Sequence, residues 1–152
     1  MATETYIPLA TTTLASSASS VTFSSIDQSY GDLILIVVPS NAMQGYLRFN
    51  ADSGSNYSFV YMRGTGSSAQ SSAGSGSFEL IDTGANELGK VEIMDYSATD
   101  KHKSTLNRSS RDRVVAKAGR WANTSAITSI SVTGATGDFS AGSTFSLYGI
   151  AK

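Results

Sequence analysis

The apolar residues of this chain occur in short clusters separated by turn residues, and this spacing constrains the fold more than any other feature. The longest apolar run covers residues 33–38, whereas a helix needs about 20 such residues to cross a bilayer. β-Branched and aromatic residues recur in the clusters, with Gly, Ser, Asn and Asp between them. This pattern is typical of an antiparallel β-sandwich or barrel.

The clusters predict eight to ten strands and no amphipathic helix. Two packed antiparallel sheets would bury one face of each strand, and a jelly roll is the expected wiring of eight such strands. We expect the segments 46–49 and 57–62 to be the arms of a hairpin, because turn-forming residues lie between them. The other predicted strands cover 21–26, 33–38, 78–81, 90–94, 114–117, 127–132 and 145–150. The continuous apolar run 33–38 predicts a central strand buried on both faces, and its length alone is also compatible with a short buried helix.

The length of 152 residues suits a single sandwich domain over 1–152, with one large core. Residues 64–77 are nearly all Gly, Ser, Ala and Gln, which predicts a flexible loop or hairpin tip. The first 20 residues lack the basic start and apolar stretch of a signal peptide. No cysteine is present, so neither a disulfide framework nor a thiolate metal site is expected.

Charged residues are few, and the basic ones are concentrated. They make up 15% of the chain, against about 25% in typical domains. Residues 1–100 hold three basic and ten acidic residues, whereas 101–120 hold seven basic residues and one acidic residue, Asp112. This segment could steer the domain onto an acidic protein surface, or it could be a solvated edge strand that resists pairing. The candidate partner-binding residues are Lys101, Lys103, Arg108, Arg111, Arg113 and Arg120.

No motif in the sequence indicates catalysis. The only histidine, His102, lies between two lysines and is expected to be an exposed surface residue. Residues 50–56 superficially resemble a calcium loop, but the twelfth position from Asn50 is Tyr61 where an EF-hand needs glutamate, so a tight turn is predicted. A net charge of -1 lacks the basic excess of a nucleic-acid-binding domain. We therefore expect no catalytic residue, metal, cofactor, nucleic acid or membrane partner.

The aromatic residues allow two interpretations. Trp121 with Tyr57, Tyr61 and Tyr96 could form a flat platform that stacks on sugars. Packing of Trp121 in the core is the favoured interpretation, because large aromatic residues dominate the cores of small domains.

Several segments resemble small structural proteins of tailed bacteriophages, particularly phages of marine bacteria and cyanobacteria. The resemblance is carried by LRFNADSGSNYS at 47–58, WANTSAITSI at 121–130, FSLYGI at 145–150 and VTFSSI at 21–26 followed by Asp32-Leu33. Residues 64–117 do not share it. It implies a β-sandwich virion protein, either a capsid decoration or knob protein or a tail-fibre module, with no catalytic residue to carry over.

Two functions follow from this resemblance. The preferred hypothesis is a decoration protein on the outer surface of the capsid, which binds the major capsid protein and could itself be a monomer or a trimer. The alternative is a tail-fibre or tailspike module that recognises a host by binding cell-surface carbohydrate. A complete domain in a short chain, without a shaft or coiled-coil heptads, favours the first.

Overall fold

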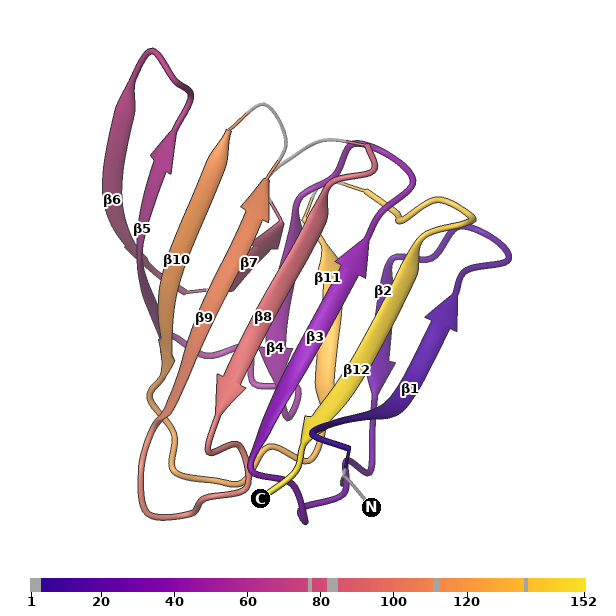
Figure 1. The fold of residues 1–152 in the computed structure, drawn as a ribbon, viewed down its shortest axis with the longest axis vertical. Coiled ribbons are helices and arrows are strands. Elements are labelled where there is room, and N and C mark those ends of the chain that lie inside the picture. The colour runs from indigo at the N-terminus through magenta and orange to yellow at the C-terminus, as the bar shows by residue number, and fades with distance from the viewer. Residues whose placement is uncertain (1–3, 77, 82–84, 111–112, 136) are drawn as a thin grey trace.

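Alternation of buried and exposed residues builds the strands. The computed structural model describes residues 4–76, 78–81, 85–110, 113–135 and 137–152, which contain twelve strands (Figure 1). In β12 (Thr144–Ile150), Phe145, Leu147 and Gly149 are buried while the two residues between them are partly exposed. The same two-residue period recurs in β4 (Gly45–Phe49). Each such strand therefore gives one face to the core.

All described strand pairs are antiparallel, and they form two sheets. The order in the eight-stranded sheet is β1 (Tyr6–Thr13), β12, β3 (Asp32–Val38), β8 (Leu88–Met94), β9 (Lys103–Ser110), β10 (Val114–Trp121), β5 (Tyr57–Gly64) and β6 (Ala69–Ser75). The order in the four-stranded sheet is β2 (Ser20–Phe23), β11 (Ile130–Gly134), β4 and β7 (Phe78–Ile81). The small sheet lies behind the large one in Figure 1.

The wiring is that of a jelly roll. Strands β1, β12, β3 and β8 of the large sheet face β2, β11, β4 and β7 of the small sheet, and the chain crosses between sheets at each step from β1 to β4. The pair β5–β6 is inserted between β4 and β7, and the pair β9–β10 between β8 and β11. These four strands extend the large sheet beyond β8, so the described residues form twelve strands where eight to ten were predicted.

The core fills the space between the two sheets. Leu33, Leu35 and Val37 of the central strand β3 are completely buried, as the apolar run had predicted. The other face of β3 is also partly covered, with Ile34 buried and Ile36 half-buried. Trp121, Tyr57 and Phe49 close the core at the start of the extension.

Two local predictions were wrong, and a third was correct only in part. The segments 46–49 and 57–62 are not hairpin partners, because β4 pairs with β11 and β7 while β5 pairs with β10 and β6. The segment 64–77 forms a hairpin tip only at residues 65–68, since residues 69–75 are strand β6, which pairs with β5. The basic segment is not an edge strand, since β9 lies between β8 and β10. Within the described residues, no helix is both long and apolar enough to span a membrane.

Candidate protein-contact surface

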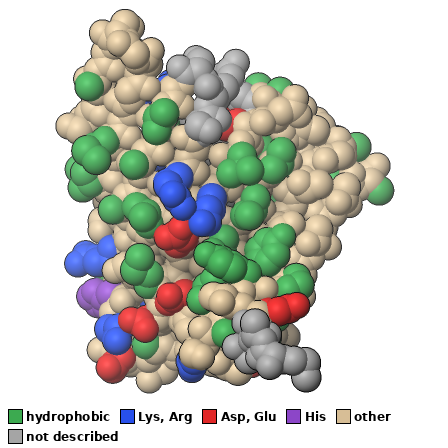
Figure 2. Space-filling model, viewed as in Figure 1, with side chains coloured by type: hydrophobic (Ala, Val, Ile, Leu, Met, Phe, Trp, Pro, Cys, Tyr) green, Lys and Arg blue, Asp and Glu red, His purple; other side chains and the backbone are tan. Residues whose placement is uncertain are grey.

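The outer face of the large sheet, which points away from the small sheet, carries apolar side chains where an antiparallel sandwich usually has polar ones. Among the described residues, six large hydrophobic residues of this face each expose between 43% and 68% of their surface. Figure 2 views this face and shows hydrophobic side chains spread across it. Large exposed apolar patches are a known feature of interaction surfaces, which makes this face the candidate site. The six residues are Tyr6, Val60, Met62, Leu88, Met94 and Val114.

Strand register aligns the residues of the outer face into rows. One row, from β3 to β5, contains Ile36, Lys90, Arg108, Ala116 and Met62. The next row contains Ile34, Glu92, Leu106, Ala118 and Val60. Because neighbouring strands lie about 4.8 Å apart, each row is a continuous band of side chains about 20 Å long.

Three charged side chains stand at the centre of this face, on the fourth and fifth of the eight strands. Lys90 Nζ and Arg108 Nη2 each lie 2.9 Å from the same oxygen of Glu92, Oε1. The contact with Lys90 and the nearby guanidinium of Arg108 lower the pKa of Glu92, so this carboxylate stays ionised. Two cations share one anion, and the cluster keeps a net positive charge.

A shallow hollow of ≈ 360 Å³ lies next to this cluster, above β9. Leu88 and Val114 stand on its two sides, and Arg108 and Lys90 border it. Ala116, Ser109 and Val115 also line the hollow. The hollow thus joins an apolar recess to a cationic border.

The six predicted partner-binding residues do not form one patch. Side chains alternate between the two faces of a sheet, so a basic run along β9 and β10 is divided between them. Arg108 and Arg120 lie on the outer face and are exposed, whereas Lys101 precedes β9 and contacts Asp95 at 3.3 Å. Arg113 is half-buried just before β10, and Arg111 lies outside the described residues.

The prediction that Lys103 binds a partner was wrong, because this residue is fully buried on the inner face. Its amine donates hydrogen bonds to the carbonyls of Lys101 (3.0 Å) and Thr124 (3.2 Å). Burial lowers the pKa of Lys103, although nearby carboxylates oppose this effect. It therefore serves the interior and cannot touch a partner.

The aromatic residues divide in a similar way. Trp121, Tyr57 and Tyr96 are buried, which confirms the core interpretation of Trp121 and removes three of the four residues from any sugar platform. Tyr61 is half-buried on the inner side of the extension and stacks on Phe59 at 6.4 Å. The amine of Lys117 lies 4.8 Å from the ring centre of Phe59.

The segment 50–56 is a tight turn, as predicted. The carboxylate of Asp52 accepts hydrogen bonds from the Gly54 amide (2.8 Å), the Asn56 side chain (2.8 Å) and the Trp121 indole (2.7 Å). These donors lower the pKa of Asp52, the bond from Trp121 most strongly. Within the part of the chain that the structure describes, no three His, Cys, Asp or Glu side chains gather as metal ligands.

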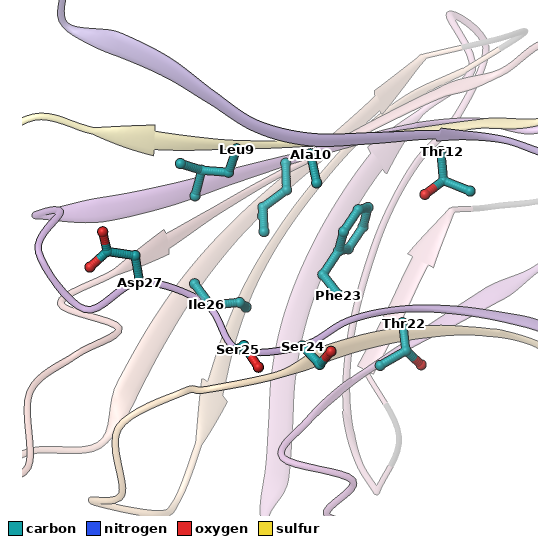
Figure 3. Close-up of a pocket in the computed structure, with 10 residues that line it drawn as sticks. Leu9, Ala10, Thr12, Thr22, Phe23, Ser24, Ser25, Ile26 and Asp27 are labelled. Carbon is teal, nitrogen blue, oxygen red and sulfur yellow. The ribbon is translucent and has the colours of Figure 1, made fainter.

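A second hollow of ≈ 420 Å³ opens at the far edge of the sandwich, between β1 and β2 (Figure 3). Leu9, Phe23, Ile26 and Leu147 give it an apolar lining, and hydroxyl groups such as that of Thr12 stand at its rim. This hollow is the seam where the two sheets diverge. Among the described residues that line it, Asp27 is the one that carries a carboxylate.

The outer face was not predicted from the sequence. Its signal is present in the segment 57–62, where Val60 and Met62 alternate with the aromatic residues Tyr57, Phe59 and Tyr61. Apolar residues on both faces of a strand favour burial of both faces. From the sequence, this interpretation was applied only to 33–38.

Comparisons with known proteins identify no family. No protein-family model matches the chain, and no curated protein matches its sequence. Among solved structures, the galectin LEC-6 of Caenorhabditis elegans is similar to 93% of this chain and 96% of its own, with 12% identity and a TM-score of 0.43. The assignment as a β-sandwich rests on the strand pairing described above.

Proposed function

We propose that this chain is a structural protein of a tailed bacteriophage that decorates the outer surface of the capsid. It binds the major capsid protein through the outer face of its large sheet and performs no catalysis. The observation that carries this proposal is the exposed apolar face, with Met62 and Val114 each more than half exposed. The assignment of the partner to the virion rests on the sequence resemblance described above.

The geometry suits a protein that works by contact. A flat face of about eight strands by seven residues covers roughly 900 Å², close to what one partner contributes to a standard stable interface. Many copies on one shell would add their contacts, so modest individual affinities give a stable coat. The packed core supports the half of this face formed by β1, β12, β3 and β8, which lie opposite the small sheet.

Cryo-electron microscopy of intact virions tests this function. Density for this chain repeated across the icosahedral shell, with the outer face of the large sheet against the capsid, supports the proposal. The Met62→Asp variant should fail to decorate shells, because the substitution places a charge in the apolar face. Thr22→Asp is the matched control, since Thr22 is exposed on the small sheet. Density confined to the tail, or absence from the particle, contradicts the proposal.

A host-recognition module that binds carbohydrate is the second candidate. The half-buried pair of Phe59 and Tyr61 favours it, because flat aromatic faces stack on sugars and Arg63 lies 6.0 Å from the Tyr61 ring. This function predicts glycan binding that is lost in Tyr61→Ala and retained in Met62→Asp. If the chain decorates capsids instead, shell binding is lost in Met62→Asp and retained in Tyr61→Ala.

A further inference from the structure

We infer that the hollow above β9 and the cations beside it form the central anchor site of the outer face, and that this site takes an acidic side chain together with a large apolar side chain of the capsid partner. This inference rests on the proposed function and specifies the chemistry of the partner. The apolar side chain enters the hollow between Leu88 and Val114, and the carboxylate pairs with Arg108 and Lys90.

The preference of the site for a large apolar side chain follows from the residues that line the hollow. Leu88 and Val114 are about half and two-thirds exposed, so covering them removes apolar surface from water. They stand on β8 and β10 and face each other across β9. A hollow of ≈ 360 Å³ easily holds one large side chain, which is the usual form of an interface hot spot.

The preference of the site for an acidic side chain follows from its charged residues. Among the described residues, Arg108 uses one guanidinium N–H group, which donates to Glu92, and its side chain is 58% exposed. A guanidinium has five N–H donors in a planar fork, so Arg108 can still receive a second carboxylate. Among the strand residues that the structure describes, the other charged residues of the outer face are Asp32 and Arg120, so these residues give the face three cations and two anions.

Charge complementarity also indicates whether the site binds the capsid partner or a second copy of this chain. Two copies of this chain packed through their outer faces would bring four cations against two carboxylates at the centre. That excess of like charge is unfavourable where the surrounding apolar surface excludes water. A partner that contributes a carboxylate balances the cluster, and we therefore assign the site to the capsid partner.

The test measures binding of the purified chain to shells assembled from the major capsid protein alone. Arg108→Gln should weaken binding at least about tenfold, because it removes a charged partner from a desolvated contact. Val114→Asp should weaken binding by a similar factor, because it places a charge in the apolar hollow. Lys101→Gln is the matched control and should change binding less than about twofold, since Lys101 lies outside the face. Binding of the wild-type chain should fall with added salt, and that of Arg108→Gln should fall less.

Three results overturn the inference, and they are distinguishable from failure of the proposed function. If the wild-type chain binds shells and Arg108→Gln binds equally well, the anchor site is wrong while the function stands. If the Arg108→Gln chain has a lower melting temperature than the wild type, Val114→Asp takes its place in the test, because Val114 is 68% exposed. Binding of Val114→Asp as tight as that of the wild type then overturns the inference. If ultracentrifugation shows a dimer that Arg108→Gln dissociates, the occupant is a second copy. If the wild-type chain does not bind shells, the proposed function fails.

Discussion

Trp121 donates its indole N–H to Oδ2 of Asp52 over 2.7 Å and so joins the end of β10 to the turn that follows β4. The two residues are 69 positions apart in the chain. The bond fixes the place where the chain passes from the small sheet to the large one. It is also the largest of the effects that lower the pKa of Asp52.

Asp52→Ala should destabilise the fold by about 2 kcal/mol, because it removes three hydrogen bonds to a charged acceptor and leaves the indole N–H without its partner. The pKa of Asp52 is lower in the folded chain than its ordinary value of 3.8. Its contribution is therefore present above that value and is lost as the pH falls through the folded pKa. Urea unfolding at neutral and acidic pH should show that stability falls less on acidification in Asp52→Asn than in the wild type. Asp138→Asn, at an exposed site, should leave the dependence unchanged.

Lys103→Met should change how stability depends on alkaline pH. Burial lowers the pKa of Lys103 below its ordinary value of 10.5, so between these two values the unfolded chain binds more protons than the folded chain. The wild-type stability should therefore rise as the pH increases toward 10.5 through this window, and Lys103→Met should lose that rise. Urea titrations between neutral pH and the range where tyrosines ionise measure the slope. An equal loss in the exposed control Lys101→Met would contradict this explanation.

Gly134→Ala should destabilise the fold by roughly 1–3 kcal/mol, because a Cβ there would lie 2.0 Å from the Gly137 carbonyl oxygen. The main chain must move to relieve this clash. Gly137→Ala is the matched control, since no atom lies within 4 Å of its added Cβ. Its stability should change by less than about 0.5 kcal/mol. Thermal unfolding compares the two, and equal losses would show that the close approach at Gly134 is unimportant.

Leu35→Ala and Met62→Ala should differ sharply in how much each lowers the free energy of unfolding. Leu35 is completely buried between the sheets, so truncation should cost about 2–5 kcal/mol through lost burial and a residual cavity. Met62 is 65% exposed, and its truncation should cost less than about 0.5 kcal/mol. Chemical denaturation measures both. A large loss at Met62 would mean that the outer face stabilises the fold itself and is not reserved for a partner.

Much of the fold could be predicted from local pattern. Alternation or a continuous apolar run located β3, β8 and β12 nearly to their ends, because side-chain periodicity is a local property of a strand. The turn at 50–56 and the burial of Trp121 followed from residue types. Strand β1 was missed, since it is exposed at most positions and ends in three threonines. Strand β6 was missed because its residues are nearly all small and polar.

The candidate site could not be predicted in the same way. The basic residues at 101–120 are close in sequence, yet Lys103 is buried and Arg108 lies on the opposite face. The anchor site combines Leu88, Arg108 and Val114 from three strands. Only the register of β8, β9 and β10 brings them together.

The sequence by itself determined that this chain forms an antiparallel β-sandwich with a filled aromatic and aliphatic core. Short apolar clusters between turn residues leave few other ways to bury apolar surface. Only the tertiary structure decided that β5 pairs with β10, that four strands extend the large sheet, and which residues share its outer face. The physical reason is that strand pairing joins distant segments through main-chain hydrogen bonds that nearly every residue can form, so local sequence does not specify the partner.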